Sequence, residues 1–180
     1  MKQAERREVT RTSILDAVLT LKQQRSGENY SSPITISEIC RVADLARPTF
    51  YQYFDSADAA VAAACAQQMI GYFQASDTSG STESETMTLW LNLLRNDALV
   101  QSALTDGGAA TRSAAISAIA DRLFGRWSST GVPHLKWRAQ FAAAGMFSVL
   151  SVWLHEPQPA ESGEDIIELV TDLARSVKNA

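Results

Sequence analysis

Apolar side chains recur at steps of three and four residues along most of the chain, and no segment alternates convincingly as a half-buried strand would. The sequence holds 27 alanines against nine glycines and five prolines, a composition that favours helices throughout. The first apolar stripe predicts a helix that begins near Thr10 and ends before Gly27. Its apolar positions are Ile14, Leu15, Val18, Leu19 and Leu21.

Two short helices are predicted next, after a polar loop. Thr35, followed three residues later by Glu38, has the pattern of a capping box that opens the first of them. Asp44 tolerates the backbone conformation of a tight turn after this helix. The second short helix is expected to start around Ala46, because Pro48 is allowed in a first turn, where no backbone donor is required.

A polar segment divides the chain in two. Residues 76–86 contain no apolar side chain that could anchor them, so we expect a linker or loop there. Segment 140–154 is apolar nearly all round, so it is either a central core helix or a helix that also meets another chain. The helices expected in the second half lie near 87–104, 112–129, 133–155 and 163–178. The predicted organisation is a first domain at 1–55, a connecting helix at 56–75, the linker at 76–86 and a helical domain at 87–180.

Composition and charge bound the class of protein. With 46% hydrophobic and 20% charged residues in 180, the chain is expected to fold and bury a real core. No apolar run approaches the ~18 residues that a membrane span needs, and the start lacks the apolar middle of a signal peptide, so we expect a cytoplasmic protein without a membrane partner. The net charge of −4 is uneven: residues 1–55 carry a net +1 and residues 56–180 a net −5. This asymmetry allows the first part to approach a polyanion.

The sequence offers little support for catalysis. Cys40 and Cys65 have no metal-type spacing and lie in apolar stretches, so we expect buried free thiols. His134 and His155 lie far apart and neither begins a metal-binding pair. No nucleophile elbow, Gly-rich phosphate loop or cysteine quartet occurs. We therefore expect no enzyme activity, no cofactor and no metal.

The two short helices and the longer one before them form a unit of the helix-turn-helix type, in which the second short helix enters the major groove of DNA. Segment 34–56, ITISEICRVADLARPTFYQYFDS, resembles the DNA-binding signature of the TetR family of transcriptional regulators. The matching residues are Thr35, Ile36, Glu38, Ile39, Ala43, Arg47, Thr49, Phe50, Tyr51, Tyr53 and Phe54. The resemblance covers about 55 N-terminal residues, and beyond residue 75 it rests on size and helical layout alone.

The resemblance implies an all-α fold with an N-terminal helix-turn-helix domain and a C-terminal helical domain for effector binding and dimerisation. It also implies a ligand-responsive repressor that binds a palindromic operator in double-stranded DNA as a homodimer and is released by a small molecule. Hydroxyl, amide and guanidinium groups on the second short helix suit phosphates and base edges, whereas Phe50 and Phe54 are expected to be core residues. The candidate DNA-binding residues are Thr35, Arg47, Pro48, Thr49, Tyr51, Gln52 and Tyr53.

Three positions depart from the family pattern. Asp44 stands where a turn glycine is usual, Ala46 where a capping serine is usual, and Ala57 where a phosphate-binding lysine is typical. We hypothesise that a basic N-terminal arm compensates by following the DNA, and the alternative is a solvated, disordered tail. The cations of this arm are Lys2, Arg6, Arg7 and Arg11.

In the second domain the resemblance implies an effector pocket and a dimer interface. No cluster of charges points to a charged ligand, so the expected effector is apolar or aromatic. The candidate pocket residues are Trp90, Leu94, Leu123, Trp127, Trp137, Phe141 and Met146. The candidate interface residues are Phe147, Leu150, Leu154, Ile166, Ile167, Leu169, Val170 and Leu173.

An alternative is a helical protein-interaction module whose degenerate helix-turn-helix no longer grips DNA, which Ala57 and the acidic total charge favour. The dependence of duplex binding on salt separates the two readings, because only neutralised phosphates give a steep salt slope.

Overall fold

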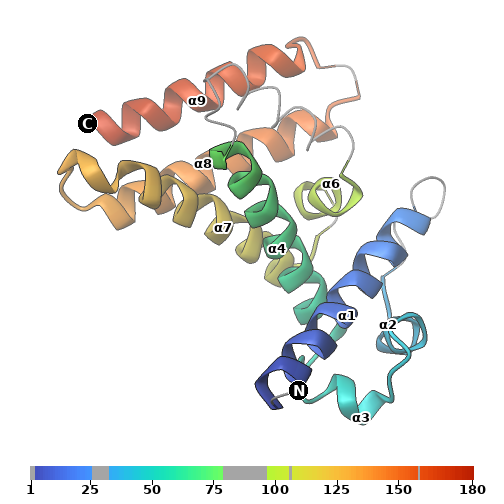
Figure 1. Ribbon diagram of the computed structural model, residues 1–180. Coiled ribbons are helices and arrows are strands. Elements are labelled where there is room, and N and C mark those ends of the chain that lie inside the picture. The colour runs from blue at the N-terminus through green and yellow to red at the C-terminus, as the bar shows by residue number, and fades with distance from the viewer. Residues whose placement is uncertain (1–2, 26–32, 79–96, 106, 158) are drawn as a thin grey trace.

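The computed structural model describes residues 3–25, 33–78, 97–105, 107–157 and 159–180, and every regular element within these ranges is a helix (Figure 1). The all-α fold class predicted from the sequence is therefore confirmed. The elements in chain order are α1 (Gln3–Gln24), α2 (Ile36–Val42), α3 (Arg47–Phe50), α4 (Ala57–Thr78), α6 (Ala98–Leu104), α7 (Ala109–Trp127), the 3-10 helix η1 (Ser128–Thr130), α8 (Leu135–His155) and α9 (Gly163–Asn179).

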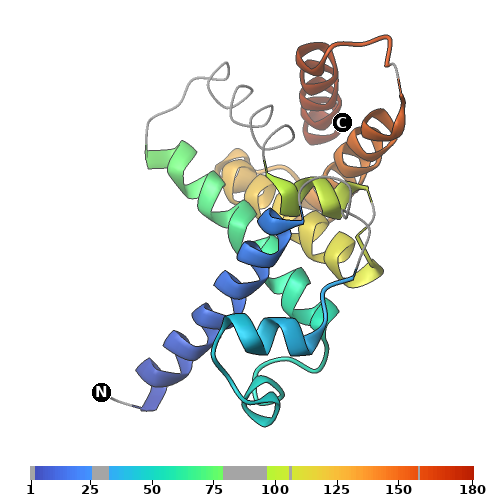
Figure 2. The ribbon, with the colours of Figure 1, turned by 90° about the vertical axis from the view of Figure 1, so that its right-hand side faces the viewer.

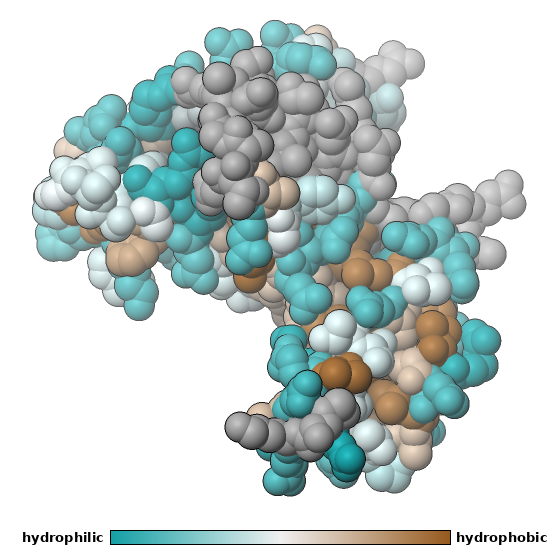
Figure 3. All heavy atoms as spheres, viewed as in Figure 1, coloured by the Kyte–Doolittle hydropathy of each residue, from teal (hydrophilic) through white to brown (hydrophobic). Residues whose placement is uncertain are grey.

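The helices form two lobes, which Figure 3 shows as an upper and a lower mass. In the lower lobe α2 packs against α1 and α3, around side chains that are wholly buried. Helix α4 leads from this lobe into the upper one, where α4 packs on α7, α7 on α8 and α8 on α9 (Figures 1 and 2). The wholly buried side chains of the lower lobe include Ile14, Leu15, Val18, Ile39 and Phe50.

Helix α1 begins well before the predicted start at Thr10. Its first turns hold only polar or exposed residues, so the apolar stripe could not reveal them. Neither Gly nor Pro interrupts residues 3–25, Glu5 stands in the first turn beside the positive end of the helix dipole, and extending an existing helix is cheap. Arg6 and Arg7 therefore lie on an exposed helical turn, and the hypothesis of a disordered tail is wrong for them; Lys2 lies outside the described residues.

The helix boundaries of the second half are close to those predicted, with two corrections. Helix α4 continues to Thr78, so the first residues of the predicted linker are helical, and its remainder lies outside the described residues. Of the helix expected near 87–104, the structure describes α6, which begins after the capping residue Asp97. The side chain of Asp97 accepts hydrogen bonds from the backbone N–H groups of Leu99 and Val100, and this cap determines where α6 starts.

Helix α8 has two different apolar faces. The inner face carries Ala139, Ala142 and Ala143, whose small side chains let α8 approach its neighbours closely, and it is buried. On the outer face, Phe141 is 70% exposed. Segment 140–154 therefore combines a core face with an unpartnered apolar face. None of the described helices is apolar over a stretch long enough to cross a bilayer.

Candidate nucleic-acid interface

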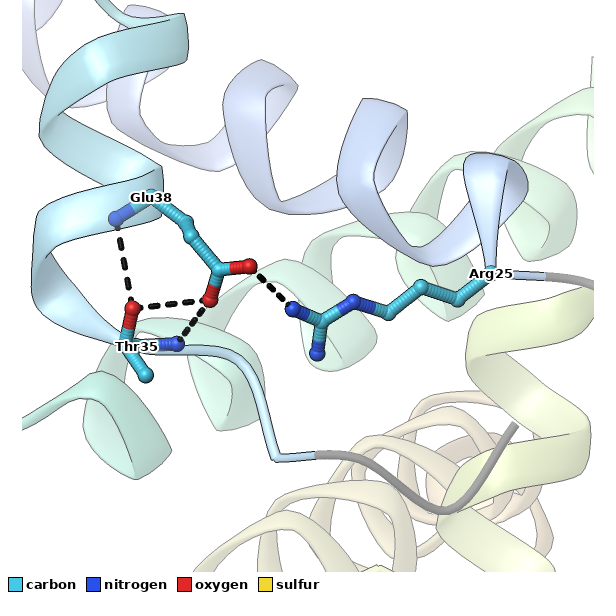
Figure 4. Close-up of polar contacts among 3 residues, drawn as sticks. All are labelled: Arg25, Thr35 and Glu38. Atoms are coloured by element: carbon cyan, nitrogen blue, oxygen red, sulfur yellow. Dashed lines mark hydrogen bonds and ion pairs between the residues drawn. The ribbon is translucent and has the colours of Figure 1, made fainter. Parts of the chain in front are cut away.

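The first part of the candidate interface is the start of α2, which a capping box holds (Figure 4). The hydroxyl of Thr35 accepts from the backbone N–H of Glu38 at 3.3 Å and donates to Glu38 Oε2 at 2.7 Å. The backbone N–H of Thr35 donates to the same carboxylate oxygen at 2.9 Å. Arg25, at the end of the α1 segment, pairs with the other oxygen, Oε1. This network fixes the start of α2 against the end of α1.

The same network determines the charge at this helix start. The two hydrogen bonds from Thr35, followed by the hydrogen bond and charge of the Arg25 guanidinium, together lower the pKa of Glu38 to about 2, against the opposing effect of burial. A carboxylate thus occupies the donors of Thr35, which the sequence analysis named as a candidate DNA-binding residue. Since the N–H and O–H donors of Thr35 are both engaged by Glu38, the structure shows Thr35 as a helix cap.

The turn between α2 and α3 has the conformation that usually favours glycine. Asp44 has a φ of 52°, in the left-handed region, and Leu45 N–H donates to the carbonyl of Cys40 at 2.9 Å. Aspartate is one of the few side chains that adopt this region with modest strain. Asp44 therefore makes the turn that a glycine was expected to make.

Helix α3 is short and is held mainly by its aromatic residues. Its N-cap, Ala46, forms no side-chain hydrogen bond, as the departure from the family pattern implied. Phe50 is wholly buried and Phe54 is 9% exposed, with 6.0 Å between their ring centroids. Arg11 of α1 covers the Phe54 ring, with its guanidinium carbon 5.8 Å from the centroid. The expectation that both phenylalanines are core residues is confirmed.

The outer side of α3 and of the turn that follows it presents the polar residues named in the sequence analysis. Arg47, Pro48, Tyr51 and Gln52 are exposed, and we call these four the recognition surface. The Tyr51 side chain is 50% exposed, with its ring edge-on to Phe50 at 5.8 Å. This arrangement leaves guanidinium, hydroxyl and amide groups outside a rigid apolar anchor.

Two other candidates on this segment are less available. Thr49 and Tyr53 are half-buried, and Tyr53 packs against the apolar core. The sequence analysis did not name Arg41, which is exposed in the last turn of α2, before the turn that leads to α3. The sequence feature that could have identified Arg41 is a cation in the last turn of the helix before the recognition helix. Acidic groups also reach this part of the surface, because Asp44 and Asp55 are exposed.

The candidate pocket residues of the described part of the chain lie on α7 and α8. Trp90 and Leu94 lie outside the described residues. Leu123 is half-buried on α7, and Trp127 is buried at the end of that helix. Trp137 is 69% exposed on α8. Two of the described candidate pocket residues, Phe141 and Met146, line a hollow between α8 and α9.

That hollow is an apolar groove of about 230 Å³ between α8 and α9. Phe141 and Met146 contribute to it from α8, and Leu173 contributes from α9. Its polar hydroxyl, on Ser176, already donates to the carbonyl of Asp172. We call it the α8–α9 groove, and its lining is Phe141, Ala142, Gly145, Met146, Val149, Val170, Leu173, Ala174, Ser176 and Val177.

Five of the eight residues of the predicted dimer interface are buried within one chain. They are Phe147, Leu150, Ile166, Ile167 and Val170. Leu154 is half-buried and packs on the core. Leu169 and Leu173 are 46% and 49% exposed. The apolar stripe of α9 was recognised correctly, but the chain uses its centre for packing on α8.

The exposed apolar residues of α8 and α9 form the outer apolar face of the upper lobe. On α8 they recur at spacings that keep them on one side of a helix. On α9 the two exposed leucines are four residues apart, and one of them lines the α8–α9 groove. The members of this face are Trp137, Phe141, Val152, Leu169 and Leu173.

The described residues contain no cluster of three or more His, Cys, Asp or Glu side chains that could hold a metal ion. Cys40 and Cys65 are free and buried, as predicted. Burial, followed by the nearby negative charge of Asp97, raises the pKa of Cys65 to about 12. This thiol therefore stays protonated at neutral pH and is a poor nucleophile or metal ligand.

No family model matches the sequence, and no curated protein matches it. Several solved structures share the fold over nearly the whole chain. A TetR transcriptional regulator from Streptococcus agalactiae is 17% identical, with a TM-score of 0.61, over 96% of this chain and 97% of that one. The TetR family repressor AlkX from a Dietzia species, implicated in biodegradation of n-alkanes, is 18% identical, with a TM-score of 0.58, over 94% and 96%.

A third similar structure is the fatty acid degradation regulator FadR from Bacillus halodurans, 14% identical, with a TM-score of 0.51, over 95% of both chains. All three likenesses extend across both lobes. The chain therefore has the fold of TetR family transcriptional regulators, as the resemblance of segment 34–56 implied. At these identities the likeness establishes the fold, and the function is argued from the surfaces of this chain.

Proposed function

We propose that this protein is a transcriptional regulator, a repressor, that binds a palindromic DNA operator as a homodimer and is released by a small-molecule effector. The observation that carries the proposal is the construction of α3. Phe50 and Phe54 fix this helix to the core, while Arg47, Tyr51 and Gln52 point away from it. Guanidinium and amide groups on such a helix suit base edges and phosphates in a major groove.

The outer apolar face supports the homodimer. Phe141 and Trp137 of α8 are each more than two-thirds exposed, and Leu173 of α9 adds to the same region. Contiguous exposed apolar side chains on a soluble chain mark an interaction surface. A second copy offers the same face, so a two-fold axis buries both at once. Two copies of α3 would then contact two half-sites related by the same two-fold axis, so the proposed operator is palindromic.

The proposed effector is a small apolar molecule. The described residues offer an apolar lining in the α8–α9 groove, and Trp90 and Leu94 remain candidates for a pocket outside the described ranges. Two proteins of similar fold carry descriptions that concern n-alkanes and fatty acid degradation. We propose an apolar effector on this basis. In this proposal the bound protein represses transcription, and the effector relieves repression by releasing it from DNA.

The direct test is binding to a fluorescent random duplex, measured by anisotropy at about 50 and about 200 mM salt. We expect affinity to fall steeply with salt, because each neutralised phosphate adds about 0.9 to the log–log slope. Arg47→Ala is expected to weaken binding and lower the slope. Its control is Arg126→Ala, which removes an exposed arginine in the last turn of α7, far along the chain from α3.

A flat and negligible response of the unmodified chain at both salt concentrations would contradict DNA binding. The protein would then be the interaction module of the alternative reading. Equal losses in Arg47→Ala and Arg126→Ala would show that binding depends on total charge and not on α3.

A further inference from the structure

Helix α6 lies at the junction of the two lobes, although it has only seven residues. It contacts α1, which belongs to the lower lobe, and α4, α7 and α8, and both ribbon views show it beside the upper end of α1 (Figures 1 and 2). A short helix in such a place can act as a spacer between the lobes if its position is fixed. The polar contacts of α6 determine whether it is.

Each of three neighbouring helices holds α6 by a side-chain hydrogen bond. From α4, Gln68 Nε2 donates to Asp97 Oδ2 at 2.9 Å, while the other oxygen of Asp97 caps α6. From α1, Lys22 Nζ donates to the hydroxyl of Ser102 at 2.7 Å. From α8, the hydroxyl of Ser151 donates to the carbonyl of Leu104 at 2.6 Å. The start, middle and end of α6 are therefore each attached to a different helix.

These contacts stand out because the surrounding core is apolar. The buried polar or charged residues of the described chain are Asp97, Ser102 and Thr111, and the first two belong to this network. Apolar contacts are not directional, whereas a hydrogen bond requires a defined donor and acceptor, and the buried side chains of Asp97 and Ser102 are costly to leave without a partner. The three bonds thus specify the register of α6 as well as its burial.

The backbone after α6 adds a steric constraint. A Cβ on Gly107 would lie 2.8 Å from Ala103 Cα and 2.9 Å from the carbonyl oxygen of Ser102. Such contacts are too short for any side chain, so the loop after α6 approaches the helix as closely as glycine alone permits. Hydrogen bonds on three sides and this close approach leave α6 little freedom.

We propose that α6 is a positioning element, whose hydrogen bonds through Lys22, Gln68 and Ser151 fix the orientation of the DNA-binding lobe relative to α8. The effect of this positioning on DNA binding rests on the proposed function. Helix α8 carries the outer apolar face, and α1 belongs to the lower lobe, which contains α3. The route from the dimer face to the DNA-reading helix passes through Ser151, α6 and Lys22. The orientation of each α3 relative to the two-fold axis is then set by these bonds.

The test compares the double variant Ser102→Ala/Ser151→Ala with the unmodified full chain. Spin labels at Gln52→Cys and Glu168→Cys, both exposed, report the distance between the two lobes by pulsed electron paramagnetic resonance. Excess unlabelled chain restricts the signal to pairs within one chain. Intact mass confirms that the buried Cys40 and Cys65 stay unlabelled. The matched control is Ser148→Ala, an exposed serine on α8.

In the double variant we expect the lobe-to-lobe distance distribution to broaden or to shift by about 2 Å, as helix shifts in switching proteins do. Affinity for duplex DNA, measured on chains that keep Gln52 and carry no label, should fall about fivefold or more, the smallest coupling usually measured. Ser148→Ala should change neither quantity, and Ser151→Thr, which keeps the hydroxyl, should retain both. If the double variant does not fold by circular dichroism, Lys22→Met removes the bond from α1 alone and is measured in the same way.

An unchanged distance distribution in a folded variant that lacks these bonds overturns the inference and leaves the proposed function standing. A changed distribution in a chain that binds no duplex DNA supports the positioning role and overturns the proposed function. A changed distribution with unchanged DNA affinity overturns the link between α6 and DNA binding. The two proposals are thereby tested separately.

Discussion

Arg25 and Glu38 join the end of α1 to the first turn of α2 by an ion pair, with 2.5 Å between Nη2 and Oε1. The pair is partly shielded, since the Arg25 side chain is 16% exposed and that of Glu38 is 33% exposed. Glu38 also completes the capping box with Thr35, so one carboxylate closes a helix start and connects two helices of the recognition lobe. The charge of this carboxylate therefore contributes to the stability of the folded chain.

The stability of the protein should fall at acidic pH in a way that depends on Glu38. Its pKa is about 2 in the folded chain against 4.5 ordinarily, so the folded state binds fewer protons than the unfolded state. The resulting stability is fully present above about pH 4.5 and is lost as the pH falls towards 2. Urea denaturation between these pH values measures it. Glu38→Gln should flatten the pH dependence, whereas exposed Glu168→Gln should leave it unchanged.

Asp44→Gly should preserve or increase stability, by up to about 1 kcal/mol, because a left-handed residue with a side chain costs about 1–2 kcal/mol and glycine's extra chain entropy offsets part of the relief. The matched control is Asp16→Gly, at an exposed position within α1, which should cost about 0.3 kcal/mol, because glycine is only slightly poorer than aspartate as a helix former. Thermal denaturation measures both. A similar loss in the two variants would contradict the role given to the turn conformation.

Ala46→Ser should stabilise the recognition helix. The N-cap of α3 has no side-chain hydrogen bond, and a serine hydroxyl there would offer a second acceptor to the backbone N–H of Thr49, which donates to the carbonyl of Ala46 at 2.9 Å. We expect a gain of about 1 kcal/mol in unfolding free energy and tighter DNA binding, since α3 is better ordered. Ala46→Val supplies the steric control without an acceptor. Equal effects of the two substitutions would show that the missing cap is unimportant.

Ala57→Lys should strengthen binding to DNA of any sequence. Ala57 is the first residue of α4 and stands where the family signature that segment 34–56 resembles typically has a lysine. A lysine at this position is expected to neutralise one phosphate and to steepen the log–log salt slope by about 0.9. The control, Ala75→Lys, adds the same charge at an exposed position near the other end of α4. An equal increase in both variants would assign the effect to net charge.

Leu173→Glu should separate dimerisation from folding. Leu173 is 49% exposed at the α8–α9 groove, so a charge there should give a monomer that keeps its helical content, measured by sedimentation and circular dichroism. Leu150 is 1% exposed, and Leu150→Ala should instead cost about 2–5 kcal/mol of stability. A Leu173→Glu variant that remains a dimer would move the interface away from this face.

Much of this protein is determined locally by its sequence. The helical periodicity, the capping box of Thr35 and Glu38 and the Pro48 start of α3 are properties of neighbouring residues. Such signals act over one or two helical turns, so they can be recognised without the fold. The aromatic anchors Phe50 and Phe54 were recognised because the signature of segment 34–56 contains them.

Only the tertiary structure decided which apolar residues are buried inside the chain and which stay outside. Ile167 and Leu169 lie on the same amphipathic helix, yet one is buried against α8 and the other is 46% exposed. Likewise, Lys22 and Ser102 are 80 residues apart, and no sequence pattern connects them. Burial depends on the direction from which a neighbouring helix packs, and that direction is set by the whole core, so these relationships appear only when the chain is folded.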